Sequence, residues 1–333
     1  MKIAIIMSGH AVEPGAGVRI QGLMWKEGLE KLGNIVDLVS FWNAYDWRSY
    51  DAIIILQHIG LFSNMAKLIS RINDKIAIAP IIDPSTTKLK TRLLAKWIRF
   101  SRYGLLSDEN NLYDGCKYGK IFLTRSNEET DYLSYCCEIP KSKIFQIPLS
   151  VRFEKEQLDF SKKEDFCFHT SRLYSGNKNV TRLVAAAKKY KFKLVLAGTL
   201  HGQYEKDWLD NLIADSTNIK YVGALSDIEL VKTYKKAKVF ALPSLVEGVG
   251  MVSMEAALYG CEIVLTNIGA PKEYWDNKAL LVDPYSIDSI GKAVVECMKY
   301  GHSQPELIHF IYDNYSLSSC SRKLEKALAS MKG

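Results

Sequence analysis

Residues 239–260 have the sequence VFALPSLVEGVGMVSMEAALYG, and this stretch decides the fold class. Its first four residues are apolar and predict a short buried strand, which Pro243 ends. The loop that follows contains Gly248 and Gly250, and the apolar run after it predicts a helix that stops near Gly260. A buried strand, a loop and a helix in succession are the unit from which parallel α/β sheets are built.

The same alternation of short β-branched runs with helical patterns continues in both directions along the chain. In the first half, strands are expected at residues 2–7, 34–40, 52–57, 76–82, 121–124 and 144–147. In the second half, strands are expected at residues 166–170, 193–197, 219–222, 239–242, 263–266 and 280–282. The polar segment 151–164 separates the two series and is interpreted as a linker. The 333 residues therefore predict two doubly wound α/β domains, residues 1–150 and 151–316, which face each other across a cleft.

Two helix starts carry a capping signal. Ser126 is followed three residues later by Glu129, and Ser226 is followed in the same way by Glu229. In such a box the serine hydroxyl accepts from the glutamate amide, and the glutamate carboxylate accepts from the serine amide. The second box precedes an expected helix at residues 228–235.

The composition is that of an ordinary globular protein, with 47% hydrophobic and 24% charged residues. No run of about 18 apolar residues is present, so no transmembrane helix is expected. The first strand is too short and too abruptly broken for a signal peptide, which predicts a cytoplasmic protein. The seven cysteines have no C-x-x-C spacing, so we expect reduced thiols and no bound metal.

Positive charge is concentrated in one segment of the first half. The net charge is +7, and six basic residues lie between Lys88 and Arg102 without an acidic residue among them. Because the rest of the chain is nearly balanced, a nucleic-acid partner is not expected. Leu89, Leu93, Trp97 and Phe100 fall on one helical stripe beside the basic residues. The stripe is interpreted either as a surface for an anionic membrane or as the core side of a solvated helix.

The loop and helix after Pro243 have the residues needed to bind a phosphorylated sugar. Free amides of Gly250, Met251 and Val252 are expected at the helix N-terminus, where a phosphate or hydroxyl can accept from them. Glu247 precedes this helix and Glu255 lies about one turn inside it. A carboxylate can accept from two vicinal hydroxyls, as ribose and hexose offer. From the residues alone, an ordinary strand–loop–helix with a capping glutamate has equal weight.

This segment resembles the E-x7-E signature of glycosyltransferase family 4 and its retaining GT-B relatives. The resemblance implies that Glu247 meets the donor sugar and that Glu255 meets the nucleotide ribose. It also places Gly248, Val249 and Gly250 at the donor, with Val249 where the family usually has an aromatic residue. The implied fold is GT-B, with residues 317–333 forming a helix that crosses back to the first domain.

Further elements of the second half resemble the same family. Ser171-Arg172-Leu173 and Lys178-Asn179 resemble its G-R-L…K-N element, whose Arg and Lys clamp the donor diphosphate. Gly198 ends a strand as in the family, and Leu225 lies in the element that borders the nucleobase. Arg172 and Lys178 suit a diphosphate leaving group because they offset the charge that develops on it.

The first half resembles the family less closely. Its segment 14–19 resembles the glycine loop that approaches the donor phosphate, which implies roles for Gly15, Gly17 and Arg19. The same residues nearly match the dinucleotide pattern G-x-G-x-x-G, with Asp37 twenty residues after Gly17. That alternative is disfavoured, because Asp37 lies inside an expected strand instead of at its end.

His58 and Asp83 each follow an expected strand and are candidate catalytic residues. The family's catalytic histidine is absent near residues 82–84, where this chain has Ile-Asp-Pro. No D-x-D motif occurs, so no essential metal is expected.

The implied activity is a retaining, hexosyltransferase-like glycosyl transfer from a nucleotide sugar, with UDP slightly favoured over GDP. The acceptor is expected to be a saccharide or a polyprenyl-linked saccharide in bacterial O-antigen or capsule synthesis, at the inner face of the cytoplasmic membrane. Two alternatives stay open. A sugar-nucleotide epimerase of the same fold would form product without an acceptor, and a non-catalytic GT-B subunit would only bind. Intact glutamates and basic residues at the donor positions argue against the second.

Overall fold

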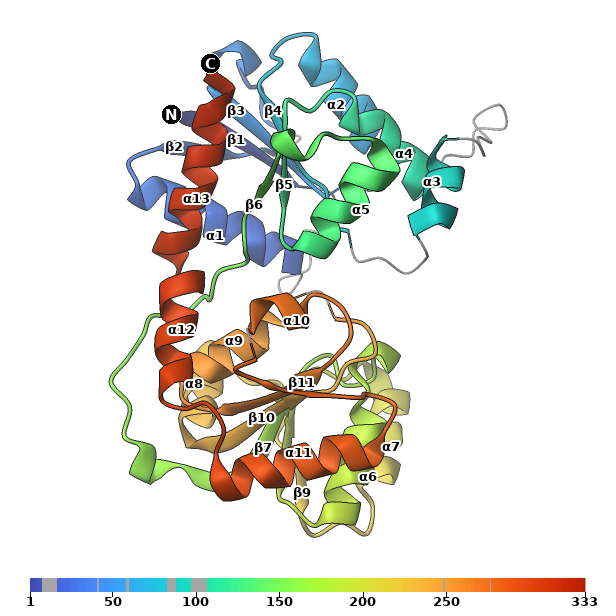
Figure 1. Cartoon of the computed structure of the whole chain (residues 1–333), viewed down its shortest axis with the longest axis vertical. Coiled ribbons are helices and arrows are strands. Elements are labelled where there is room, and N and C mark those ends of the chain that lie inside the picture. The colour runs from blue at the N-terminus through green and yellow to red at the C-terminus, as the bar shows by residue number, and fades with distance from the viewer. Residues whose placement is uncertain are drawn as a thin grey trace. The chain divides into compact units, whose positions relative to one another are not determined.

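The computed structural model describes residues 1–7, 17–40, 42–57, 60–82, 88–96, 107–247, 249–275 and 277–332. The chain divides into two compact units (Figure 1). The first unit consists of Met1–Ser150 together with Leu317–Gly333, and the second unit consists of Val151–Ser316.

The first unit contains a parallel sheet of six strands in the order β2-β1-β3-β4-β5-β6. The strands are β1 (Lys2–Met7), β2 (Ile35–Leu38), β3 (Ala52–Leu56), β4 (Ile76–Ala79), β5 (Ile121–Thr124) and β6 (Ile144–Gln146). Every residue of β3, β4 and β5 is buried. Continuous apolar strands of this kind form where helices cover both faces of a sheet.

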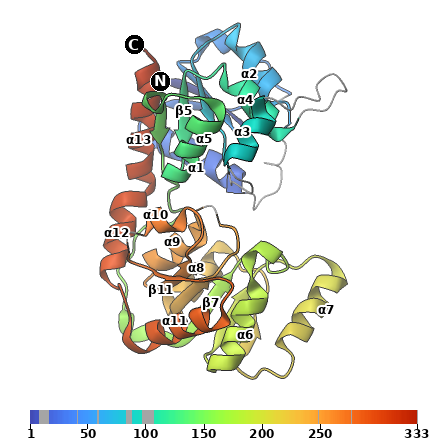
Figure 2. The same cartoon turned by 45° about the vertical axis from the view of Figure 1, so that its right-hand side comes forward.

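Alternate residues of the strands contact two different layers of helices. Ile3 and Ile5 pack against α1 (Gly17–Lys31) and α13 (Leu317–Ala329), which lie side by side in Figures 1 and 2. Ile6 belongs to the opposite core, formed with α2 (Phe62–Ser70), α4 (Asp108–Cys116) and α5 (Asn127–Cys137). α3 (Lys88–Lys96) packs against α4 and α5. A Cβ on Gly28 of α1 would lie 1.8 Å from the Ser321 hydroxyl, so α13 approaches α1 closely at this glycine.

The second unit has a parallel sheet of the same size, in the order β12-β11-β10-β7-β8-β9. The strands are β7 (Glu164–Thr170), β8 (Leu194–Ala197), β9 (Ile219–Tyr221), β10 (Ala237–Leu242), β11 (Glu262–Thr266) and β12 (Leu280–Val282). α6 (Val180–Tyr190), α7 (Gly202–Ile213) and α11 (Ile287–Tyr300) contribute to the core on one face. The other face is covered by α8 (Asp227–Lys236) and α9 (Met251–Leu258), with α12 (Glu306–Tyr315) packed on α9. The short helix α10 (Pro271–Tyr274) follows β11.

The predicted α/β class, with two doubly wound sheets, is confirmed, and each expected strand is present. The segment 317–333, expected to form a helix, is helical as α13 and a final 3-10 turn, Ser330–Lys332. Some strands end earlier than expected. β4 ends at Ala79 instead of residue 82, because Ile81 has a φ of 54° and leaves the extended conformation.

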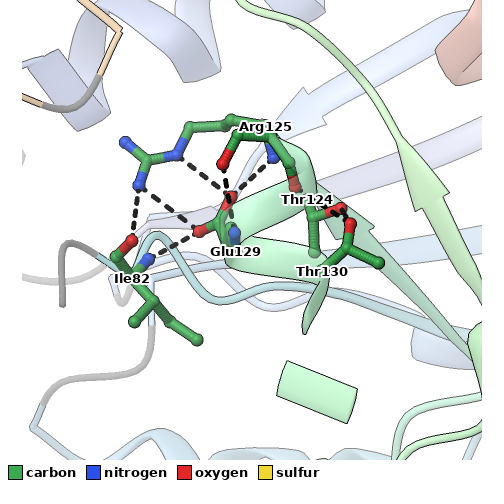
Figure 3. Close-up of polar contacts among 6 residues, drawn as sticks. Ile82, Thr124, Arg125, Glu129 and Thr130 are labelled. Atoms are coloured by element: carbon green, nitrogen blue, oxygen red, sulfur yellow. Dashed lines mark hydrogen bonds and ion pairs between the residues drawn. The ribbon is translucent and has the colours of Figure 1, made fainter. Parts of the chain in front are cut away.

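The capping box at Ser226 is confirmed. The Ser226 hydroxyl accepts from the Glu229 amide, and the Glu229 carboxylate accepts from the Ser226 amide. At Ser126 the prediction is half wrong. The Ser126 hydroxyl accepts from the Glu129 amide at 3.1 Å, but the Glu129 carboxylate accepts from the amides of Ile82 and Arg125 instead (Figure 3).

Candidate donor site

Parallel strands end at one edge of the second sheet, where the loops after β7 and β10 lie close together. The Asn179 side chain donates to the carbonyls of Pro243, at 2.9 Å, and Pro284, at 2.7 Å. The Leu245 amide donates to the Asn177 carbonyl at 2.8 Å. These bonds hold the segment that carries Arg172 and Lys178 against the segment that carries Glu247.

Glu247 and Lys178 form an ion pair at this edge. The Lys178 ammonium donates to Glu247 Oε2 at 2.8 Å, and the buried Ser244 hydroxyl donates to the same oxygen at 2.9 Å. The two side chains of the pair are 27% and 9% exposed. Among the described residues, Glu247 Oε1 has no hydrogen-bond donor, so one oxygen remains for a ligand.

Arg172 is the second basic group of this edge. It is exposed at the start of the loop after β7 and forms no ion pair with any residue in the described ranges. The loop is held close to β8 by Gly198, whose φ is 144° and whose Cβ would lie 1.9 Å from the Ser171 carbonyl oxygen. Only glycine fits this position.

His169 supports the same loop from inside the sheet. The fully buried ring lies with Nδ1 2.8 Å from the Ala241 carbonyl and Nε2 2.7 Å from the Ser171 hydroxyl. Burial lowers the pKa of His169 to about 4, and the nearby Lys178 charge also lowers it. The neutral ring therefore donates from Nδ1 and accepts at Nε2 from the Ser171 hydroxyl. This fixes the residue before Arg172.

The N-terminus of α9 is left without a side-chain cap. Gly250 is the N-cap, with a φ of 72°, and as a glycine it has no side chain that could cap the first turn. The amides of Met251 and Val252 therefore lack helical acceptors and are suited to an anion. The side chain of Val249 is 3% exposed and packs into the core, so this residue can offer only its backbone to a ligand.

Glu255 is held by an arginine from the predicted linker. Arg152 Nε donates to Glu255 Oε1 at 2.6 Å, and Arg152 Nη2 donates to Oε2 at 3.1 Å. Arg152 Nη1 also donates to Asp227 at 3.0 Å. The Glu255 side chain is 1% exposed and that of Arg152 is 23% exposed. Burial raises the pKa of Glu255, and the bonds from Arg152 partly offset this rise.

Three further predicted residues are described elsewhere in the two units. Leu225 is half-buried in the loop after β9. Gly17 is the first residue of α1 in the first unit, where a Cβ would meet no atom within 4 Å, and Arg19 follows it in the same helix. The predictions for Gly15, His58, Asp83 and Gly248 lie outside the described residues.

The first unit has its own polar cluster at the end of β4 (Figure 3). The Glu129 carboxylate accepts from the Ile82 amide at 2.6 Å and from the Arg125 amide at 2.5 Å. The Arg125 guanidinium donates to both Glu129 oxygens and to the Ile82 carbonyl. Ile82 directly precedes Asp83, so this cluster fixes the backbone next to one predicted catalytic residue.

The dinucleotide alternative depends on a free Asp37. In the structure Asp37 lies inside β2, opposite Ala4, and its carboxylate accepts from the Tyr50 hydroxyl at 2.7 Å. A ribose ligand should lie at the end of the strand instead. This position of Asp37 disfavours a nicotinamide nucleotide.

The basic segment is described as far as Lys96 and includes α3. Leu89 and Leu93 are 60% and 46% exposed, so the alternative of an apolar stripe in the core is wrong for these two residues. Arg92 pairs with Glu138 at 3.0 Å. In the described part of the chain, every helix is too short or too polar to cross a membrane.

Comparison with known families agrees with the geometry of the second unit. Residues 150–311 match the family model "Glycosyl transferases group 1". The match covers just under half of the chain. The donor-site residues of the second unit, including Arg152, fall inside the match.

Two curated relatives of the chain are named as mannosyltransferases. The O-antigen chain mannosyltransferase B of Escherichia coli is 25% identical over 210 residues, covering 57% of this chain and 55% of the relative. The GDP-mannose-dependent monoacylated alpha-(1-6)-phosphatidylinositol monomannoside mannosyltransferase of Corynebacterium glutamicum is 30% identical over 115 residues, covering 32% and 29%. The chain thus spans about half the length of the first relative and less than a third of the second.

Solved structures extend the likeness over both units. HepE of Anabaena, solved with UDP and glucose, has a TM-score of 0.70 at 13% identity and covers 99% of this chain and 100% of that one. The sucrose-phosphate synthase of Thermosynechococcus elongatus has a TM-score of 0.68 at 14% identity and covers 100% and 99%. The chain has the GT-B fold.

The sequence did not predict two residues that support the candidate donor site, Arg152 and His169. Arg152 lies in the segment interpreted as a linker, and its partner Glu255 is 103 residues away. No local spacing predicts such a pair. His169 did leave a signal, because it is a buried polar residue that directly follows the apolar residues 166–168 of its strand.

Proposed function

We propose that this chain is a retaining glycosyltransferase that moves a sugar from a nucleoside diphosphate sugar to a saccharide or lipid-linked saccharide. The observation that carries the proposal is the Glu247–Lys178 pair beside the exposed Arg172 and the uncapped start of α9. The second unit then holds the nucleotide sugar and the first unit holds the acceptor.

The diphosphate is the part of the donor that this site fits best. Arg172 and Lys178 supply two positive groups, and Met251 and Val252 supply amides at a helix N-terminus. As the bond from the anomeric carbon to the diphosphate breaks, negative charge grows on the leaving group. The acceptor oxygen bonds to that carbon on the same face, and the acceptor proton leaves with the diphosphate. Groups fixed in advance around that charge lower the barrier.

The two glutamates are assigned to the two sugars of the donor. Glu247 has one oxygen bound by Lys178 and Ser244 and the other left for hydroxyls of the transferred sugar. Glu255 has about four lone-pair positions, of which Arg152 uses two, and the buried Tyr234 hydroxyl lies beside the carboxylate, so the lone pairs left over are assigned to the ribose diol. Because Glu255 is 1% exposed, ribose can reach it only when neighbouring side chains move.

We further propose that the transfer needs no metal ion, because Arg172, Lys178 and the helix amides offset the leaving charge. Turnover should therefore persist in excess EDTA. Complete loss on chelation, with recovery on adding manganese or magnesium, would contradict this.

The sequence slightly favours a UDP-sugar, whereas both curated relatives are named as mannosyltransferases and one as GDP-mannose-dependent. The donor screen must therefore include both nucleotides. A role in bacterial surface-polysaccharide synthesis at the inner membrane face fits the O-antigen relative and the exposed, basic α3.

The decisive experiment is a thermal-shift screen against UDP-, GDP-, dTDP- and CDP-sugars, followed by a transfer assay with the donor that binds. At a hundredfold excess over Kd, the right donor should add about 2.7 kcal/mol of stability. The variant Lys178→Ala should lose turnover. A chain that binds none of these donors, or that converts a donor without any acceptor, would contradict the proposal.

A further inference from the structure

A large cavity lies in the first unit, and none of its lining residues belongs to the donor site. It encloses about 630 Å³ between α2 and the loop that follows β2. Its walls are formed by Ile6, Val39, Ser40, Asn43, Tyr45, Trp47, Gly60, Leu61, Asn64, Met65, Leu68, Ile69 and Ile72. The volume is within the range of small-molecule sites, which is about 300–1,000 Å³.

The walls suit a hydrocarbon better than a sugar. Most lining side chains are aliphatic or aromatic, and none of the described lining residues is charged. The Tyr45 hydroxyl already accepts from the Ser40 amide at 2.9 Å. The Asn43 side-chain amide points to the same hydroxyl at 3.5 Å. A saccharide placed here would lose its bonds to water and find few replacements, which costs binding free energy.

The mouth of the cavity exposes apolar side chains. Leu61, Leu68 and Ile72 line it and are 74%, 59% and 47% exposed. Trp42, next to the lining residue Asn43, is 95% exposed. Single exposed leucines are common in proteins, but a group of them around one apolar cavity marks a binding surface.

Along α2 and its C-cap the charge beside this mouth has one sign, whereas the exposed Asp46 lies between the lining residues Tyr45 and Trp47. Between Leu61 and Ile72 the charged residues are Lys67 and Arg71, both exposed, and no acidic residue occurs. Each directly precedes a lining residue, Leu68 or Ile72, so the two cations flank the apolar stripe of α2. An amphiphile with an anionic head and an apolar chain is complementary to this arrangement.

The cavity lies at the edge of the sheet where ligands bind in this type of fold. Ile6 is near the end of β1, Val39 directly follows β2, and Gly60 lies in the connection after β3. The strand order is β2-β1-β3, so β2 lies on one side of β1 and β3 lies on the other. In parallel sheets, ligands bind outside the carboxyl ends of the strands where the strand order reverses in this way.

We propose that this cavity binds the hydrocarbon chain of an amphiphilic acceptor whose phosphate lies near Lys67 and Arg71. This rests on the proposed function, because it names the acceptor class: a saccharide carried on a phosphorylated lipid. A single chain enters the cavity, and the saccharide end stays outside it.

The probe is dodecyl phosphate, used as a monomer below its critical micelle concentration and titrated calorimetrically into the full chain. Inorganic phosphate is the control for the head group. We expect saturable binding of dodecyl phosphate alone. Leu68→Glu should weaken it at least about tenfold, because a charge then lies at the apolar mouth. Leu61→Glu should act in the same direction and serves if Leu68→Glu does not fold.

Leu89→Glu is the matched control, since Leu89 of α3 is as exposed as Leu68 but does not line the cavity. Its affinity for dodecyl phosphate should equal that of the wild type. The proposal is overturned if the wild type does not bind the monomer, if it binds only vesicles, or if Leu89→Glu weakens binding as much as Leu68→Glu. Nucleotide-sugar binding, measured in the same variants, reports separately on the proposed function.

Discussion

Each unit buries one glutamate against one arginine, and the two pairs differ in what else holds the carboxylate. Glu129 and Glu255 are 2% and 1% exposed. Glu129 accepts from two backbone amides as well as from Arg125. In the described structure, the backbone donates nothing to Glu255, and both its oxygens accept from Arg152.

The difference teaches which carboxylate is available for function. Backbone amides cannot leave Glu129 unless the end of β4 and the start of α5 move, so this carboxylate is structural. An arginine side chain can rotate or share its partner, so Glu255 can take a ligand hydroxyl without loss of the fold. Burial alone does not separate the two cases, but the identity of the donors does.

The largest expected effect is on stability. Glu129→Ala removes a carboxylate from Arg125 and leaves two buried amides unpaired, so the free energy of unfolding should fall by about 3–5 kcal/mol. Urea denaturation measures it. The control Asp131→Ala, in the same helix, removes an exposed pair with Lys141 and should cost less than about 1 kcal/mol. Similar costs for both variants would contradict a structural Glu129.

The next largest effect is on turnover. It concerns the Lys178–Glu247 ion pair, whose side chains are more exposed than those of either glutamate–arginine pair. Lys178→Ala should reduce kcat about a hundredfold or more while changing donor Kd less, because the charge that Lys178 meets grows in the transition state. Lys189→Ala, which breaks an exposed pair with Asp288, is the control. Equal losses in kcat and in donor affinity would mean that Lys178 only holds the ground state.

His169 extends the comparison to a buried group with no counter-charge. Its pKa is about 4 in the folded chain and about 6.5 when unfolded, so the unfolded state binds the proton first. Above pH 6.5 the ring is neutral in both states, and His169 does not lower the free energy of unfolding. As the pH falls from 6.5 toward 4, the free energy of unfolding decreases by about 3 kcal/mol at most. Urea midpoints between pH 7 and 4 should fall less steeply for His169→Asn. Parallel pH profiles would remove His169 as the cause.

The smallest effect separates the two glutamates directly. Glu255→Ala should weaken nucleoside diphosphate binding by about 1.5–3 kcal/mol, through the lost bonds to ribose. Its stability cost should be below that of Glu129→Ala, because Arg152 is partly exposed and keeps Asp227. Calorimetric titration and urea denaturation measure the two quantities. Unchanged nucleotide affinity in a folded variant would remove Glu255 from the ribose site.

The sequence predicts those parts of the molecule that depend on near neighbours. Apolar runs such as 52–56 define the strands because both faces are buried, and Ser226 finds its partner three residues away. Glu129 has the same local pattern as Glu229, yet its carboxylate bonds to Ile82, 47 residues away. The local pattern cannot reveal that competing partner.

The candidate site follows the same division. The segment with Glu247 and the loop with Lys178 are predicted as separate motifs, and the parallel sheet brings them to one edge. The bond from Arg152 to Glu255 and the apolar cavity beside α2 depend on tertiary packing, which no spacing in the sequence encodes. Leu89 and Leu93 show that a helical stripe of apolar residues does not by itself predict burial, because both side chains are exposed.

The position of α13 has a consequence for biosynthesis. Leu324 and Leu328 complete the core that contains Ile3 and Ile5, although more than three hundred residues separate them from the first strand. On the ribosome, the second unit is synthesised before α13. An apolar face of the first unit therefore stays uncovered until α13 emerges. Domains usually fold as they emerge, and uncovered apolar surface favours aggregation. During synthesis, apolar surface of the first unit therefore stays uncovered until the last helix has been made.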